Sequence, residues 1–165
     1  MITKLVPVTL QERSIVENLF QYYLYELSGF TGVKINPQGA FNFNASSLDE
    51  YWTNPDKHAF IILCEDEVAG FSLLRRYPNE PTVYDIDQFF ILKKFNGKGV
   101  GRDAFRLSTS LFPGQWMTRV LHENDRALKF WLKVISEATD GNYELAAEID
   151  VDLSMNFIRY EISAS

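Results

Sequence analysis

The sequence predicts an α+β fold, with a mixed, mostly antiparallel twisted sheet of about seven strands and four helices, in the order βααβββαβαββ. Three observations predict this fold. Hydrophobic residues recur at strand spacing in some stretches and at helix spacing in others, Gly and Pro mark the boundaries, and no repeat or linker divides the chain. We therefore expect one domain spanning residues 1–165, with a strand-loop-helix-strand unit at its centre.

The first half of the chain predicts a strand, two helices and three more strands, at residues 2–8, 9–29, 47–53, 58–64, 67–76 and 82–92. Thr9 and Glu12 have the Thr-x-x-Glu spacing of a capping box, which opens the first helix. Residues 30–44 are rich in Gly, Pro and Asn and predict a loop. Because Glu65 and Asp66 make a compact turn between two apolar runs, we expect an antiparallel hairpin there.

The second half predicts a helix that follows a glycine-rich segment and reaches Leu111, then a strand, a helix and two strands, at residues 115–121, 124–139, 143–154 and 157–162. Pro113 ends the first of these helices, and Asn124 is placed to cap the second. From Tyr143 to Ser154 apolar and polar residues alternate, which is typical of a half-buried strand.

The composition narrows the range of partners. A net charge of −6 argues against a large nucleic-acid footprint, because phosphate binding depends on clustered Lys and Arg. No stretch approaches the roughly 18 apolar residues of a membrane span, and the N-terminus lacks the apolar core of a signal peptide. One cysteine, Cys64, cannot build a disulfide framework, and the two isolated histidines do not predict a metal site. We expect a cytoplasmic monomer or homodimer that binds no nucleic acid, membrane or metal.

The glycine-rich segment Asn96-Gly97-Lys98-Gly99-Val100-Gly101 lies between a predicted strand and a predicted helix. Main-chain N–H groups and the positive helix end can converge there on a phosphate or pyrophosphate, while the alternative is a flexible connection. The Walker A motif is absent, because its Lys must be followed by Ser or Thr. The segment Gly99-x-Gly101-x-x-Ala104 matches a dinucleotide fingerprint, but the preceding strands are expected to be antiparallel, so this remains a minor alternative.

Two stretches carry a resemblance to a known family. The segment from Phe89 to Gly101, FFILKKFNGKGVG, resembles the core motif of the GNAT superfamily of N-acetyltransferases, in which a strand leads through a short turn to Gln/Arg-x-x-Gly-x-Gly/Ala. The segment from Asn124 to Lys133 is similar to the second motif of that family, Asn-x-x-Ala-x-x-Phe-Tyr-x-Lys. The likeness is strongest over residues 82–135, and the order of predicted elements extends it over nearly the whole chain.

The resemblance implies that acetyl-CoA is the cosubstrate. In the family the coenzyme lies in a V-shaped gap where two parallel strands diverge, its pantetheine arm pairs with a strand edge, and the glycine loop holds its pyrophosphate. Unpaired main-chain groups at such a gap need partners, which an amide-bearing arm supplies. The implied contacts with the coenzyme are Phe89, Phe90, Ile91, Asn96, Gly97, Lys98, Gly99, Val100, Gly101, Arg102, Asn124 and Trp131.

Two carboxylates are the candidates for catalysis. Asp85 occupies the place where many family members carry a general-base Glu. Asp85 and Asp87 share one face of the predicted strand, so the pair can bind an ammonium group and take its proton. The alternative is a solvated strand face. Gln88 is a further polar group that is expected to orient the substrate.

The second motif departs from the family at Trp131, where the usual general acid is Tyr. An indole N–H donates a hydrogen bond but does not release a proton near neutral pH, so the thiolate needs another donor, for which His122 is held in reserve. We expect an acyltransferase that moves an acetyl group directly from acetyl-CoA to a primary amine of a small molecule or peptide. The alternative is a non-catalytic module that binds acyl-CoA as a sensor.

Overall fold

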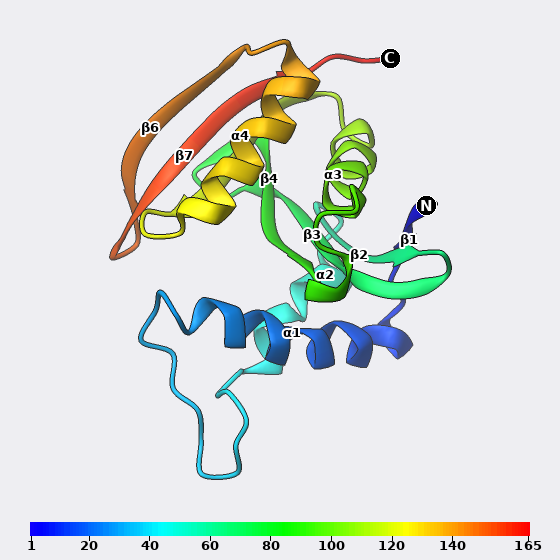
Figure 1. Cartoon of the computed structure of the whole chain (residues 1–165), viewed down its shortest axis with the longest axis vertical. Helices are drawn as coiled ribbons and strands as arrows, with labels where there is room; N and C mark the ends of the chain where they lie inside the picture. The colour runs from blue at the N-terminus through cyan, green and yellow to red at the C-terminus, as the bar shows by residue number, and fades with distance from the viewer.

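Seven strands form one sheet in the computed structural model, which describes residues 1–165 (Figure 1). The strands lie in the order β1-β2-β3-β4-β5-β7-β6, and every neighbouring pair is antiparallel except β4 and β5. Their bounds are Thr3–Pro7 (β1), Lys57–Cys64 (β2), Glu67–Tyr77 (β3), Glu80–Ile91 (β4), Gly114–Leu121 (β5), Tyr143–Asp150 (β6) and Leu153–Ile162 (β7). The predicted mixed, mostly antiparallel sheet is confirmed.

Four α-helices cover the two faces of the sheet, namely Arg13–Leu27 (α1), Glu50–Thr53 (α2), Val100–Ser110 (α3) and Asp125–Thr139 (α4). On one face, Phe20 of α1 stacks on Phe71 of β3 with ring centroids 5.0 Å apart. On the other face, α3 and α4 bury Phe105 and Trp131 against β5 and β7. The sheet therefore separates two apolar cores, which are the main source of its stability.

Local sequence signals set the helix ends. The Thr9 hydroxyl and main-chain N–H both donate to Glu12, which completes the capping box at a 3₁₀ turn, Leu10–Glu12, ahead of α1. At α4 the Asn124 side chain accepts a hydrogen bond from the Ala127 N–H at 3.1 Å. Both predicted helix starts are confirmed.

The prediction of a single half-buried strand over residues 143–154 is wrong. The chain turns at Val151, whose φ of 56° is left-handed, so β6 ends at Asp150 and β7 begins at Leu153. Val151 and Leu153 continue the apolar spacing of Ile149, which conceals the reversal in the sequence. In the structure the alternation does not mark one face, because Ile149 lies opposite Ser154 and Leu153 lies opposite Asp150. β6 is an edge strand, and Leu145 and Ile149 are 46% and 76% exposed.

A bulge interrupts the pairing of β3 with β4. Leu73 lies opposite Gln88 and Leu74 lies opposite Ile86, so Asp87 has no partner in β3. A bulge changes the direction of the side chains around the extra residue. Asp87 and Gln88 consequently both reach the face covered by α1 and α2, although they are adjacent in the sequence.

Candidate active site

The only parallel pair of strands, β4 and β5, separates soon after it begins. These strands pair only through Tyr84 with Trp116 and Asp85 with Met117. Beyond Asp85, β4 continues to Ile91 with β3 as its only strand neighbour. Main-chain groups on the other edge of β4 are left free for a partner that carries amide groups. In Figure 1 this part of β4 is seen between α3 and α4.

The glycine loop follows directly from the free edge of β4. Gly97 and Gly99 have φ values of 74° and 81°, a backbone conformation that favours glycine, and Gly99 precedes the first residue of α3. None of the six main-chain N–H groups from Gly97 to Arg102 donates a hydrogen bond to the protein. These donors lie at the positive end of the α3 dipole, so the loop can bind an anion.

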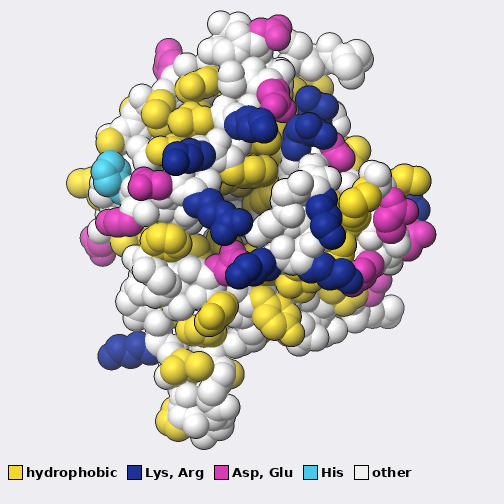
Figure 2. Space-filling view, in the orientation of Figure 1, with side chains coloured by type: hydrophobic (Ala, Val, Ile, Leu, Met, Phe, Trp, Pro, Cys, Tyr) yellow, Lys and Arg dark blue, Asp and Glu magenta, His cyan; other side chains and the backbone are white.

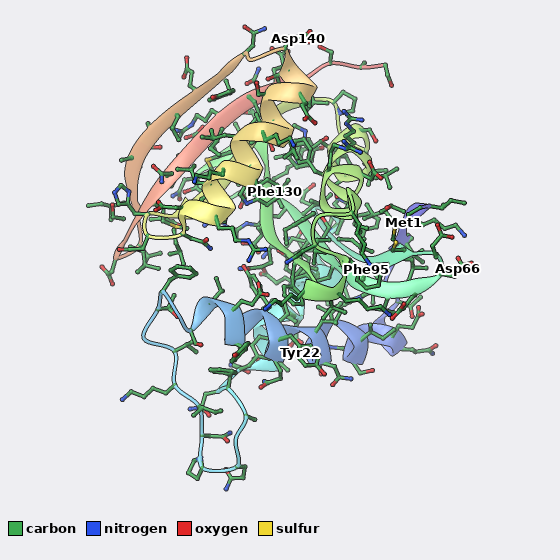
Figure 3. The ribbon with its side chains drawn as sticks, viewed as in Figure 1. Met1, Tyr22, Asp66, Phe95, Phe130 and Asp140 are labelled. Atoms are coloured by element: carbon green, nitrogen blue, oxygen red, sulfur yellow. The ribbon has the colours of Figure 1, made fainter.

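Buried side chains fix both ends of this loop. Phe95, which is labelled in Figure 3, is 4% exposed, and Val100 is 1% exposed. Both pack in one apolar cluster with Ile62 and Cys64 of β2. Gly101 allows α4 to approach α3, because a Cβ added there would lie 3.1 Å from the ring of Phe130. Packing beneath the loop therefore holds both of its ends in place.

The remaining polar side chains of the loop face solvent. Asn96, Lys98 and Arg102 are exposed, and the Arg102 guanidinium folds over Gly99, 3.2 Å from where a Cβ would lie. Lys and Arg side chains gather around the middle of the molecular face that carries α3 and α4 (Figure 2). This face is locally cationic although the chain has a net charge of −6, and a local field of this sign attracts phosphate groups.

The aromatic residues of the two motifs pack mainly on one another. Trp131 is 8% exposed and meets Phe89 edge to face at 5.1 Å, with Phe105 at 6.0 Å. Phe90 is buried on the opposite face against Phe71. Their side chains thus build the walls of the core, and the free main chain of Phe89 to Ile91 is what β4 offers to a ligand.

On the α1–α2 face, Asp85 and Asp87 form a charged cluster with two arginines. Arg75 of β3 donates from Nε to Asp85 Oδ2 at 2.9 Å, and its Nη2 lies 3.3 Å from Asp87 Oδ1. Arg119 of β5 donates from Nη2 to Asp85 Oδ2 at 3.0 Å and to Asp87 Oδ1 at 3.2 Å. The Tyr51 hydroxyl of α2 donates to Asp87 Oδ2. The structure brings the two predicted carboxylates together.

Burial distinguishes the two carboxylates. Asp85 has no exposed surface, and its Oδ1 has no hydrogen-bond partner in the protein. Burial raises the pKa of the Asp85 carboxyl above its usual value, and the positive charge of Arg119 acts against that shift. The Asp87 side chain is 14% exposed, so of the two it is the one that a substrate can reach directly.

Two other predicted residues, Asn124 and His122, lie apart from this cluster. The side-chain oxygen of Asn124 accepts the hydrogen bond that caps α4, and His122 is exposed in the turn after β5. Gln88 accepts a hydrogen bond from the Tyr23 hydroxyl of α1 at 2.5 Å, which orients its amide.

Sequence reasoning missed Arg75 and Arg119. A signal for Arg119 was present, because it is the one charged residue in the strand from Gly114 to Leu121. A charge inside such a strand is costly to bury without a partner, which predicts a carboxylate nearby.

No helix is long and apolar enough to cross a membrane. No group of three or more His, Cys, Asp or Glu side chains is arranged to hold a metal ion.

Comparison with known proteins places this geometry in context. A model of the Acetyltransferase (GNAT) family matches residues 22–135. No curated protein sequence matches the chain. Among solved structures, an acetyltransferase from Thermus thermophilus has a TM-score of 0.70 at 16% identity, covering 98% of each chain.

Two further solved structures contain coenzyme A. An aminoglycoside acetyltransferase in complex with coenzyme A has a TM-score of 0.69 at 14% identity, covering 97% of this chain and 95% of that one. A spermidine N-acetyltransferase from Vibrio cholerae in complex with CoA and spermine has a TM-score of 0.65 at 14% identity, covering 96% and 95%. At these identities the likeness shows a shared fold.

Proposed function

Because the chain belongs to the GNAT family of acetyltransferases, we propose that it moves the acetyl group of acetyl-CoA directly to a primary amine of a small molecule or peptide. The observation that carries this proposal is the row of six unpaired N–H groups, Gly97 to Arg102, next to the free edge of β4. A loop of this kind beside a strand edge suits a ligand that combines a pyrophosphate with an amide-bearing arm.

The residues present fit acetyl-CoA. The main chain from Gly97 to Gly101 would hold the pyrophosphate, and Asn96, Lys98 and Arg102 lie exposed around it. The free main chain of Phe89 to Ile91 would pair with the amides of the pantetheine arm. Bound there, acetyl-CoA would supply an activated thioester beside the stretch of β4 that no longer pairs with β5.

The transfer itself needs a neutral amine. We assign Asp87 the role of base, because it is the exposed member of the pair, and Asp85 a supporting role behind it. The amine nitrogen loses a proton to the carboxylate and attacks the thioester carbonyl carbon. A C–N bond forms and the C–S bond breaks. The nitrogen then gives up its second proton to the departing thiolate, so the products are the amide, CoA with a free thiol, and protonated Asp87, which returns its proton to solvent.

The charge of the cluster favours a cationic acceptor. Asp85, Asp87 and Asp150 supply three carboxylates against the two guanidiniums of Arg75 and Arg119, which leaves one negative charge in excess. An ammonium group would balance that charge before it gives up its proton. The spermidine and aminoglycoside acetyltransferases of the same fold are named for acceptors with amino groups, which supports an amine here.

Calorimetric titration with acetyl-CoA tests the proposal, with Gly99→Glu as the blocking variant. We expect saturable binding by the wild type and none by Gly99→Glu, because the new side chain puts a carboxylate among the free N–H groups at a φ of 81°. Gly39→Glu is the matched control, since Gly39 also has a φ of 81° and its Cβ would meet nothing. An acetyl-CoA thiol-release assay over a panel of amines follows. Absence of binding by the wild type would refute the proposal.

A further inference from the structure

Arg119 lies where the two parallel strands diverge. It is two residues beyond Met117, the last residue of β5 that pairs with β4. Its guanidinium spans from β5 to both carboxylates on β4, and its Nη1 also donates to Asp150 at the end of β6. Only 12% of the side chain is exposed, and the guanidinium carbon lies 5.7 Å from the centre of the Tyr77 ring. The side chain is held on several sides.

Building on the proposed function, we infer that Arg119 is a positioning residue that holds Asp85 and Asp87 together and keeps this pair ionised as the base of the transfer. Two carboxylates on one strand face repel each other, and each makes the other harder to ionise. Burial adds to that penalty at Asp85, which has no exposed surface. A guanidinium that donates to both carboxylates offsets these effects at once.

Every charged or titratable group around the pair enters this balance. Arg75 of β3 supplies a second positive charge, and Asp150 of β6 opposes Arg119 by occupying its other amino group. Tyr77 of β3 lies beside Arg119, and Glu50 of α2, which interacts with the charge of Arg75, is paired with Lys57 of β2. The remaining neighbours are neutral phenols, from Tyr23 of α1, Tyr51 of α2 and Tyr160 of β7, and burial raises the pKa of each above its usual value. They stay protonated near neutral pH, so charge control of the pair falls to the two arginines.

Arg119 differs from Arg75 in what it connects. Arg75 is paired with Asp85 across the β3–β4 ladder, so the sheet already sets that contact. Arg119 reaches the pair across the gap between β4 and β5, where the sheet provides no hydrogen bonds. If Arg119 were lost, Arg75 would still keep Asp85 in its position. The two carboxylates would have lost one of the two positive charges that favour their ionised form.

The test is the pH dependence of kcat/KM for the amine in Arg119→Gln and Arg119→Lys. In Arg119→Gln we expect the acid limb to move to higher pH by about one unit or more, because removal of a contacting cation raises a carboxyl pKa. Activity would fall about tenfold or more below the limb and recover as pH rises. Arg119→Lys keeps the charge, so its limb should stay near that of the wild type while the maximal rate falls.

Arg159→Gln is the matched control. Arg159 of β7 also contacts two carboxylates, Glu148 of β6 and Glu80 at the start of β4. Neither carboxylate contacts Asp85 or Asp87, so loss of Arg159 should leave the acid limb unchanged. KM for acetyl-CoA should remain unaltered in all three variants. An acid limb in Arg119→Gln that coincides with that of the wild type would overturn the inference, even if the rate falls.

Carbon-13 NMR of labelled aspartate carboxyl groups reads the same ionisation without any turnover. We expect the Asp85 signal to titrate at higher pH in Arg119→Gln than in the wild type, because the charge of Arg119 acts to lower the pKa of this carboxyl. If it does so in a protein that acetylates no amine, the proposed function fails, and of the inference only the effect of Arg119 on ionisation stands. If the enzyme is active but this signal does not move, the inference fails and the proposed function stands.

Discussion

The two faces of β4 carry two parts of the site that are built in opposite ways. The glycine loop is a main-chain site, made by six consecutive N–H groups and fixed by two buried residues, Phe95 and Val100. The charged cluster is a side-chain site, to which β3, β4, β5, β6 and α2 each contribute. One part depends on local conformation, and the other depends on the register of the whole sheet.

This difference separates their tasks. A main-chain cradle keeps its donors through most side-chain substitutions, which suits a coenzyme common to a family. A side-chain cluster changes with single substitutions, which suits an acceptor that differs between proteins of one fold. The buried ion pairs of Asp85 are a poor source of stability, because desolvation offsets most of their attraction. The proposed role in catalysis accounts for these buried ion pairs better than a role in stability does.

The largest expected effect comes from Asp87→Asn, which keeps the shape of the side chain and removes its basicity. We expect kcat for the amine to fall about 100- to 10,000-fold, the usual contribution of a general base. Acetyl-CoA affinity should not change, because the loop lies on the other side of β4. Asp56→Asn removes a carboxylate from the exposed pair with Arg76 and should keep full activity. If Asp87→Asn lost acetyl-CoA affinity and amine turnover to the same extent, coenzyme binding and catalysis would not be separated between the two faces of β4.

The same contrast explains what could be predicted from the sequence. A few consecutive residues encode each of three features, the glycine loop, the capping box and the asparagine cap. These features could therefore be predicted without knowledge of the tertiary structure. Asp85 and Asp87 could be paired from strand periodicity alone, since residues two apart share a face. The bulge at Asp87 could not, because it arises from the pairing of two strands.

Contacts between distant segments escaped the sequence for the same reason. Arg119 and Asp85 are 34 positions apart, and only the parallel pairing of β4 with β5 brings them together. The turn at Val151 was missed because its residues continue the alternation of the strands on both sides. No short stretch of sequence predicts either the Arg119–Asp85 contact or the turn at Val151. The one local indication is the single Arg in strand β5, because a buried charge needs a partner.

An intermediate effect is expected at Gly70 of β3, which lies opposite Ile91 at the end of β4, shortly before the glycine loop. A Cβ at this position would lie 1.8 Å from the carbonyl oxygen of Phe90, so the β4 main chain would have to move. We expect Gly70→Ala to lower the free energy of unfolding by about 3 kcal/mol, as overpacking does.

Denaturant unfolding measures this change, with Gly32→Ala as the control. A Cβ at Gly32 would meet nothing within 4 Å, so its stability should change by less than about 0.5 kcal/mol. Because Gly70 supports the shared strand, the surviving fold should lose both acetyl-CoA affinity and amine turnover. Loss of only one of them would show that the two parts of the site are mechanically independent.

The smallest effect is expected from Lys98→Ala in the glycine loop. If the main chain does most of the binding, an exposed lysine adds only a screened attraction, and acetyl-CoA affinity should fall about two- to fivefold. Calorimetry at two salt concentrations measures this, and the difference between variant and wild type should shrink at high salt. Lys34→Ala removes an exposed lysine from the loop after α1 and should have no effect. A hundredfold loss of affinity in Lys98→Ala would mean that the loop also binds acetyl-CoA through its side chains. The loop and the charged cluster would then differ only in which residue types bind, and no longer in main-chain against side-chain binding.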